Sequence, residues 1–332
     1  MLNEDIQRIL NQIAEHQSTC EDEEITASMI NMDEESGHWQ IQNPRSITPD
    51  NAHFWSHAES QLLERIKVPA SYIHRCPIDL QARNINYWLR KANNKQFLIR
   101  KKNASVRAVF STRFKPELDD YHVLPVILST LNEDDNPKLQ PLIQGNEITR
   151  LKIRYPSLER NHDQGELTPG VEIINSEVGY SALWIRPMVY GRFAYDEYGF
   201  ISKGGSHSTR FPHISQLNPD KIKEAVLRAK DAAQVGMFQI FEADHVVVQE
   251  PVREIENLIS EADFLTERIG SNLKAEYEQQ QSASKLKIAR SILDAVKDLP
   301  IFQRYLAEAE VGKYLNLFED IDDRLASIVQ MS

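Results

Sequence analysis

A dense run of basic residues is the feature of this sequence with the clearest chemical meaning. Between Arg65 and Lys115 the chain carries thirteen Lys or Arg residues and a single acid, Asp79. Phosphate groups are the usual partners of so dense a positive charge, so the run predicts contact with a phosphate-bearing molecule. Within the run, the residues that we expect to contact phosphates are Arg83, Arg90, Lys91, Arg100, Lys101, Lys102, Arg107 and Arg113.

Aromatic residues are interleaved with these cations. They are Tyr72, Tyr87, Trp88, Phe97, Phe110 and Phe114. Aromatic rings can stack on unpaired bases, which favours a single-stranded nucleic acid as the partner. Most of the six alternate with polar residues, so we expect at least half of them to lie in the core. Trp88 falls on the apolar stripe of a predicted helix, and we expect it to pack inward rather than to meet a base.

The remainder of the chain is acidic, which leaves other interpretations of the basic run open. The whole chain has a net charge of −11, and residues 1–60 carry twelve acids against two bases. The basic run could therefore pack against the acidic flanks as an internal charge balance. A small anionic ligand is a third interpretation.

Four more cations further along the chain are candidate phosphate contacts. They are Arg186, Arg192, Lys203 and Arg210. The even spacing of the first two in a predicted strand places both on one face of a sheet. There they could hold phosphates, or they could pair with Glu172 and Glu177. The other two flank a Gly-Gly turn that can cup an anion.

Carboxylates leave a catalytic interpretation open. Glu177, at the end of a predicted strand, could hold Mg²⁺ together with Asp119 or Asp120. We favour a plain turn over residues 175–179, in which Gly179 takes a positive φ and the preceding Asn or Ser bonds the backbone. We therefore assign no catalytic residue, no metal ligand and no cofactor.

Periodicity predicts the elements that position these residues. Strand-like alternation occurs over residues 96–100, 105–111, 149–155, 171–177 and 180–193. The first two strands are expected to form a hairpin. Helical spacing occurs over residues 2–14 and 49–66, and Asp79 is expected to cap a further helix whose inward stripe is Ile85, Trp88, Leu89 and Ala92. Residues 18–37 are polar and acidic, as in a loose connector.

The fold class that follows is α+β. We expect an antiparallel sheet flanked by helices, followed by an all-helical C-terminal region. The expected parts are an amphipathic helix and acidic linker over residues 1–47, an α+β core over 48–217, and helices over 218–332. The C-terminal helices are expected to mediate self-association or to recruit a partner.

Composition excludes several classes of protein. The chain has two cysteines, Cys20 and Cys76, which cannot supply a disulfide framework. No apolar run approaches the length of a membrane span, so we expect no membrane partner. The first residues are acidic and polar rather than basic and apolar, so we expect no signal peptide and a cytoplasmic location.

Two stretches of the sequence resemble a known family. The stretch IKVPASYIHRCPIDLQARNINYWLRK, followed by VRAVFSTRFKPELDD, is similar to the first half of the phage/plasmid-like family called domain of unknown function 932. The stretch VEIINSEVGYSALWIRPMVYGRF resembles its second signature. The resemblance runs from about Ala58 to His213, half the chain, and residues 194–199 depart from it because they lack the family's Cys-Asn-Gly-like turn. It implies a mobile-element setting in DNA metabolism and assigns no reaction.

The functional interpretation that follows is a non-enzymatic, nucleic-acid-binding protein of a mobile element. It would bind single-stranded DNA, or assist annealing or replication in phage or plasmid recombination. One alternative is a metal-dependent enzyme that acts on nucleic acid or nucleotides. The other is an acidic protein-interaction or inhibitor protein whose negative surface imitates nucleic acid.

Overall fold

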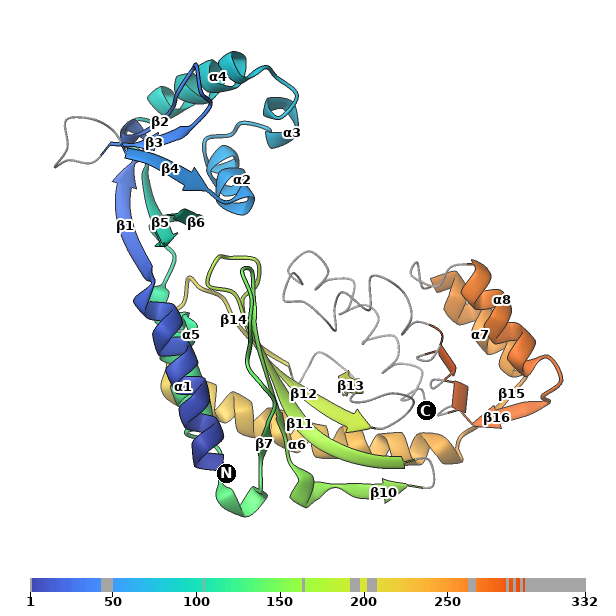
Figure 1. Cartoon of the computed structure of the whole chain (residues 1–332). Coiled ribbons are helices and arrows are strands. Elements are labelled where there is room, and N and C mark those ends of the chain that lie inside the picture. The colour runs from blue at the N-terminus through green and yellow to red at the C-terminus, as the bar shows by residue number, and fades with distance from the viewer. Residues whose placement is uncertain are drawn as a thin grey trace. The chain divides into compact units, whose positions relative to one another are not determined.

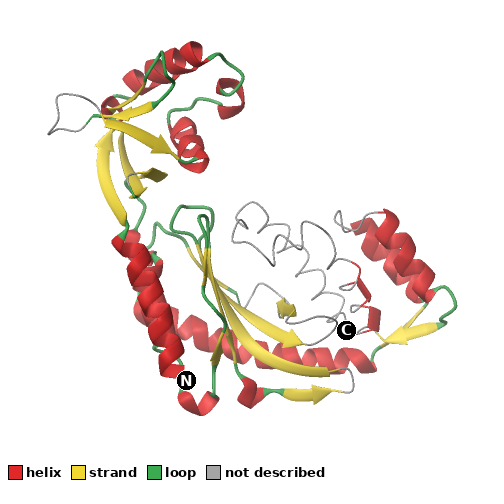
Figure 2. Ribbon diagram, in the orientation of Figure 1, coloured by secondary structure: helices red, strands yellow, loops and turns green. Residues whose placement is uncertain are grey.

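Helices and antiparallel-rich sheets build the chain, as the α+β prediction requires (Figure 1, Figure 2). The computed structural model describes residues 2–42, 50–103, 105–162, 165–191, 198–201, 208–261, 267–284 and five positions between 287 and 295. It forms two compact units. The small unit comprises Leu10–Glu117 and His213–Gln216, and the large unit comprises the described parts of Met1–Ile9, Leu118–Pro212 and Leu217–Ser332. The predicted boundaries near residues 47 and 217 stay predictions.

A six-stranded sheet forms the frame of the small unit. Its strands are β1 (Cys20–Thr26), β2 (Ile30–Met32), β3 (Trp39–Ile41), β4 (Asp50–Phe54), β5 (Gln96–Lys102) and β6 (Ser105–Ser111). They lie in the order β1-β5-β6-β4-β3-β2, and every neighbouring pair is antiparallel except β4 with β6. The predicted hairpin is confirmed as β5 and β6. The expected acidic connector is wrong, because its residues pair with β5 as an edge strand.

Helices pack on this sheet. They are α2 (Ser56–Arg65), which contacts β4 and β6, and α4 (Ile78–Lys91), which contacts β2. The short helix α3 (Ala70–Ile73) contacts α2, and a 3-10 helix, η1 (Ala27–Met29), precedes β2. The predicted helix over residues 49–66 starts later, because β4 occupies its first residues. Pro77 holds the N-cap position of α4, so Asp79 lies in the first turn and its side chain is no cap. Ile85 and Leu89 of α4 are fully buried, which stabilises the unit by about 1.5–3 kcal/mol for each side chain.

A second, curled sheet forms the large unit. Its strands are β7 (Lys138–Leu139), β8 (Ile143–Gln144), β9 (Thr149–Arg154), β10 (Arg160–His162), β11 (Gly165–Asn175), β12 (Leu183–Gly191), β13 (Tyr198–Ile201) and β14 (Thr209–Phe211). The main path is β13-β12-β11-β9-β7, and all its pairs are antiparallel, as predicted for residues 149–193. The long helix α6 (Pro219–His245) packs along β11 and β12 (Figure 1). The apolar residues Val171, Ile173, Leu183 and Ile185 are buried.

The remaining elements are short or flank these sheets. Helix α1 (Leu2–Ser18) counts with the large unit in its first half and with the small unit in its second half. Helix α5 (Asp120–Leu128) contains Pro125, and short turns occur at Pro116–Leu118, Glu133–Asp135 and Pro156–Leu158. Among the helices within the described ranges, none combines the length and the apolar character that crossing a membrane requires.

The region after α6 is helical in its larger part. It contains α7 (Pro251–Glu261) and α8 (Glu267–Tyr277), with the short strands β15 (Val247–Gln249) and β16 (Ser282–Ser284) paired with each other. The prediction of an all-helical region is therefore wrong for this pair of strands, which α7 and α8 separate in the chain. Residues 301–332, for which we also predicted helices, lie outside the described residues.

Candidate nucleic-acid interface

The basic strand β5 lies against the acidic strand β1, and this pairing engages several predicted phosphate contacts. The guanidinium of Arg100 donates to both carboxylate oxygens of Asp22, at 2.8 and 2.6 Å, and Arg100 is only 3% exposed. On the next residues, the ammonium of Lys101 pairs with Glu23. The internal charge balance that the acidic flanks suggested therefore holds for β5.

Two further cations of the basic run point toward His16. The ammonium of Lys102 lies 3.3 Å from its Nδ1, and the guanidinium of Arg107 lies 3.1 Å from its Nε2. Arg107 is 2% exposed and also lies over the ring of Trp55, at 5.4 Å from the ring centroid. A side chain this deeply buried cannot reach a polymer in solution, so Arg107 and Arg100 leave the set of candidate phosphate contacts.

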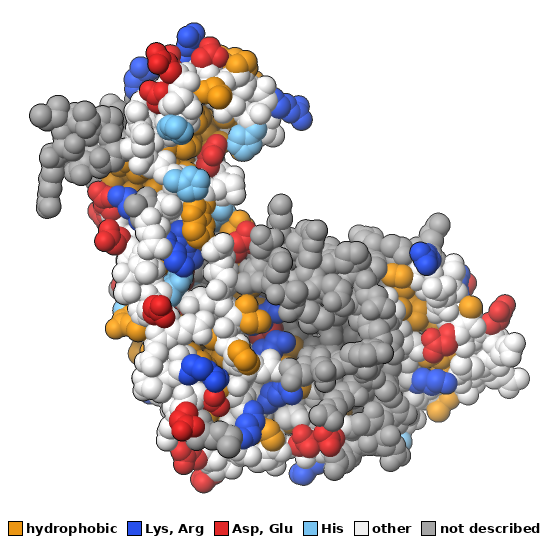
Figure 3. Space-filling model, in the orientation of Figure 1, with side chains coloured by type: hydrophobic (Ala, Val, Ile, Leu, Met, Phe, Trp, Pro, Cys, Tyr) orange, Lys and Arg blue, Asp and Glu red, His pale blue; other side chains and the backbone are white. Residues whose placement is uncertain are grey.

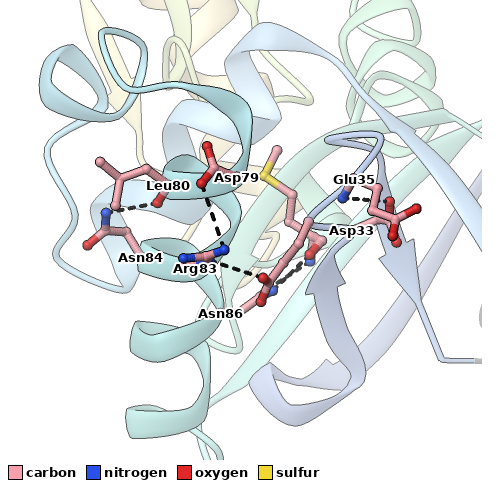
Figure 4. A network of polar contacts seen from close by, with 9 residues as sticks. Asp33, Glu35, Asp79, Leu80, Arg83, Asn84 and Asn86 are labelled. Atoms are coloured by element: carbon pink, nitrogen blue, oxygen red, sulfur yellow. Dashed lines mark hydrogen bonds and ion pairs between the residues drawn. The ribbon is translucent and has the colours of Figure 1, made fainter.

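Helix α4 is fixed on the sheet by one buried amide. The side chain of Asn86 accepts a hydrogen bond from the backbone N–H of Met32 at 2.8 Å and donates one to the carbonyl of the same residue at 2.7 Å (Figure 4). Ile85 and Leu89 are buried beside it. These contacts set the rotation of α4 about its axis, and they turn the opposite side of the helix outward.

Arg83 lies at the margin of that outward side. Its guanidinium pairs with Glu34 at 3.2 Å and approaches Asp79, one turn earlier, at 3.8 Å (Figure 4). All three side chains are more than half exposed. Exposed pairs of this kind contribute about 0–1 kcal/mol, so a phosphate could replace either carboxylate at little cost.

The outward side of α4 carries aromatic and basic side chains together. We call Leu80, Tyr87, Trp88, Arg90 and Lys91 the α4 outer face. Tyr87 is 49% exposed and Trp88 42% exposed, and their rings meet edge to face at 5.5 Å between centroids. The ammonium of Lys91 lies 5.6 Å from the centroid of Tyr87. Basic, acidic and apolar side chains are mixed over the surface of this part of the small unit (Figure 3).

The exposure of Trp88 corrects the prediction that it packs inward. Ala82, Ile85 and Leu89 already fill the side of α4 that meets the sheet. Asn86, which is hydrogen-bonded to β2, completes this buried side, and Trp88 is not part of it. The expectation that at least half of the six aromatics are buried is confirmed, since Phe97, Phe110 and Phe114 lie in the core.

Tyr72 of α3 adds a further exposed ring to the small unit, at 51% exposure. A hydrogen bond with Cys76 raises the pKa of its phenol, and a hydrogen bond with Asn84 of α4 acts in the opposite direction. The phenol therefore stays neutral at physiological pH, as stacking on a base requires.

The remaining cations of the basic run differ in exposure. Arg90 and Arg113 are exposed, and within the described ranges neither has an ion pair with a carboxylate. Arg65 is half-buried, and burial lowers the pKa of its guanidinium. The structure thus divides the predicted set, with Arg90, Lys91 and Arg113 outward and the β5 and β6 residues engaged within the unit.

The downstream candidates fall partly on the sheet of the large unit. Arg186 is buried on β12, opposite Glu172 of β11, whose carboxylate lies 3.2 Å from Nε of Arg150 on β9. Arg210 is exposed on β14. Arg192 and Lys203 lie outside the described residues.

The segment 175–179 forms the predicted turn. Gly179 has a φ of +85°, and the hydroxyl of Ser176 accepts the N–H of Tyr180 at 3.0 Å and donates to the carbonyl of Glu147 at 2.6 Å. The buried amide of Asn175 donates to the carbonyl of Leu118. This turn connects β11 to β12, and the hydrogen bonds of Asn175 link it to the start of α5.

The carboxylates of the catalytic alternative do come together beside this turn. Asp120 donates its backbone N–H to Glu177 at 3.2 Å, and its carboxylate accepts from Asn175 at 2.9 Å. These contacts anchor the first turn of α5. Among the described residues, no three His, Cys, Asp or Glu side chains are grouped so that they could hold a metal ion.

Sequence reasoning missed three cations of the large unit. Arg150, Lys152 and Arg154 occupy alternate positions of β9 and share the face of Arg186. The signal was present, because even spacing within a predicted strand places all three on one side. The basic run between Arg65 and Lys115 is the stronger pattern in the sequence, and only its residues and four later cations were chosen as candidates.

Comparisons with known proteins found no relative of this chain. No protein-family model, no curated protein and no solved structure matches the chain. The resemblance to the phage/plasmid-like family therefore stays a prediction.

Proposed function

We propose that this protein binds nucleic acid, single-stranded DNA in particular, and that the α4 outer face makes the contact. The observation that carries the proposal is the joint exposure of Tyr87 and Trp88 beside Arg90 and Lys91. An aromatic ring exposed to water contributes little to the stability of the fold, but it can stack on an unpaired base. The neighbouring cations supply the contact with phosphates.

The arrangement favours a single strand over a duplex. Bases of a duplex are stacked on one another and offer no open face to an exposed tyrosine or tryptophan. In a single strand each base has a free face, and stacking contributes about 1–3 kcal/mol per base. Arg113 and Arg75, both exposed in the small unit, are further contacts with the backbone in this proposal.

The biological setting in the proposal is that of a mobile element. It rests on the resemblance of residues 58–213 to the phage/plasmid-like family, and the role is annealing or replication within recombination. The role is non-enzymatic and needs no cofactor. Self-association through the C-terminal helices is part of the same proposal, and among the described side chains of α6 the large apolar residues Leu227, Val235 and Phe238 are exposed.

The test is the affinity of the full chain for a fluorescent oligothymidylate and for a duplex of equal length. The double variant Tyr87→Ala, Trp88→Ala is expected to lose at least about tenfold in affinity for the single strand. Lys223→Gln, an exposed position on α6, is the matched control and is expected to bind as the unchanged chain does. Equal affinity of the double variant and the control would overturn the assignment to α4.

A further inference from the structure

A cavity opens in the small unit beside Arg90 of helix α4. Residues of η1, of the strands β2 and β3 and of α4 line it, and all of them belong to the small unit. Its volume of about 350 Å³ lies within the range of roughly 300–1,000 Å³ that is usual for small-ligand sites. Arg90 also belongs to the α4 outer face, so the cavity is continuous with the surface that we propose for the single strand.

Hydrogen bonds fix the backbone around this cavity. The N–H of Gln42 donates to the carbonyl of Met29 at 2.7 Å, which ties the end of β3 to η1. In α4, the buried amide of Asn86 bonds both backbone groups of Met32 on β2 (Figure 4). Arg90 follows Asn86 by about one helical turn, so both side chains leave α4 on the same side. The walls of the cavity are therefore held in place by the fold itself.

Three side-chain amides, of Asn31, Gln40 and Gln42, line the cavity together with Arg90. Asn31 and Gln40 are paired across β2 and β3, and Nδ2 of Asn31 donates to Oε1 of Gln40 at 3.3 Å. This bond leaves Oδ1 of Asn31 as an acceptor and Nε2 of Gln40 as a donor, and neither atom has a further hydrogen bond among the described residues. The exposed side chain of Gln42 makes no hydrogen bond within the same part of the chain. The amides therefore offer a ligand both donors and acceptors.

Arg90 adds a planar set of donors to these amides. Its side chain is exposed, and its guanidinium has neither an ion pair nor a hydrogen bond within the described ranges. A guanidinium carries five N–H groups in a fixed fork and has no acceptor. Arg90 thus differs from Arg100 and Arg107, which are buried and whose N–H groups already contact neighbours. Its fork is available to a ligand in the cavity.

The residue types of the lining match a purine base. Arginine makes paired hydrogen bonds with O6 and N7 of guanine, and side-chain amides make them with N6 and N7 of adenine. Cytosine is usually contacted by a carboxylate, and the described residues that line the cavity include no Asp or Glu. A purine also has two polar edges, so it can meet Arg90 and the amides at once. Met29 and Leu89 add apolar contact for the flat face of the base.

We propose that this cavity takes one unpaired purine base of the single strand that binds the α4 outer face. The inference rests on the proposed function and adds a base preference to it. Stacking on Tyr87 and Trp88 accepts bases of every kind, because each base has an aromatic face. Hydrogen bonds from the amides and from Arg90 reach the edge of the base, where the four bases differ.

The test compares the affinity of the full chain for an oligothymidylate with its affinity for three strands that carry a single adenine, guanine or cytosine at the centre. Adenine or guanine is expected to raise the affinity at least about fivefold, and cytosine is expected to leave it unchanged. Equal affinity for all the strands, or a preference for cytosine, would overturn the inference and leave the proposed function intact. A chain that binds none of the strands would remove the proposed function, and this inference with it.

Gln42→Ala separates the cavity from the α4 outer face. The side chain is exposed, so its removal leaves the core intact. The purine preference is expected to fall below about twofold, with the affinity for oligothymidylate unchanged. Gln279→Ala, an exposed position of the large unit, is the matched control and should keep the preference. The Tyr87→Ala, Trp88→Ala variant should weaken the binding of every strand by the same factor. An equal purine preference in Gln42→Ala and Gln279→Ala would contradict the role given to the cavity.

Deoxyadenosine and deoxyguanosine monophosphate distinguish a free nucleotide from a base within a strand. They are added in excess over the strand while the purine preference of the unchanged chain is measured again. The preference should persist, because contacts of the same strand with α4 bring its base to the cavity at a high effective concentration. Loss of the preference would overturn the assignment to a strand and give the cavity to free purine nucleotides.

Discussion

At the scale of single residues, the buried ion pair between Arg100 and Asp22 decides how the basic run is divided. Its two hydrogen bonds and the 3% exposure of Arg100 make it part of the interior. A guanidinium in such a place needs its carboxylate, because an unpaired buried charge is strongly unfavourable. The cations Arg90 and Lys91 of α4, in contrast, are exposed to water and can contact a ligand.

Removing the charge of Asp22 is therefore expected to destabilise the small unit. Asp22→Asn removes the negative charge that accepts both hydrogen bonds of the buried Arg100 and should lower the free energy of unfolding by about 3 kcal/mol, as measured in urea. Glu21→Gln, an exposed neighbour on β1, is the control and should change it by less than about 0.5 kcal/mol. Similar losses in the two variants would contradict the role given to the pair.

Tyr155 gives a pH-dependent prediction at the same scale. Burial, and secondarily the charge of Asp135, raises the pKa of its phenol well above the usual value of about 10. The folded chain thus keeps the phenol neutral where the unfolded chain ionises it. The stabilisation is fully present below about pH 10 and is lost as the pH rises further.

The measurement is the free energy of unfolding on both sides of pH 10. Tyr155→Phe cannot ionise, so its stability should fall less steeply above that pH than the stability of the unchanged chain. Tyr121→Phe, at an exposed position, should follow the unchanged chain. Parallel curves for all three proteins would show that Tyr155 does not couple folding to protons.

At the scale of elements, helix α4 and strand β2 are held together by Asn86. Asn86→Ala removes the partners of the N–H and the carbonyl of Met32 in a buried setting. We expect a loss of about 1–3 kcal/mol in a thermal or urea unfolding experiment. Asn93→Ala, on the exposed turn after α4, should cause almost none, and equal effects would contradict the anchoring role.

The elements that could be predicted are those whose pattern lies in neighbouring residues of the sequence. The β5–β6 hairpin and the strands β9, β11 and β12 alternate visibly in the sequence, and all were predicted. Strand β1 was missed because its run of acids looks like a solvated linker. It becomes a strand through its pairing with β5, a partner more than seventy residues away, which no local pattern reports.

The candidate site was predictable to a similar degree. The cations of α4 were predicted as phosphate contacts, and Arg83, Arg90 and Lys91 are exposed, as positions outside the predicted inward stripe should be. The burial of Arg100 and Arg107 and the exposure of Trp88 depend on residues far away in the sequence, which no local pattern reports. Arg186 was singled out, but the sheet face it shares with β9 required knowledge of the strand order.

At the scale of the whole molecule, self-association is a prediction that α6 allows to be tested. Val235 and Phe238 are 56% and 54% exposed on this helix. If the C-terminal helices join copies of the chain, Phe238→Glu should lower the molar mass measured by light scattering. Lys223→Glu, also on α6, should leave the mass unchanged. An unaltered mass in Phe238→Glu would remove α6 from the proposed contact between copies.

Affinity for a single strand as a function of salt concentration tests the central claim most directly. Each phosphate that a cation neutralises contributes about 0.7 to the slope of log affinity against log salt. The unchanged chain should therefore bind far more weakly at high salt, and Arg90→Gln, Lys91→Gln should reduce the slope by about 1.4. An affinity that ignores salt, or a slope that these two substitutions leave unchanged, would contradict the account.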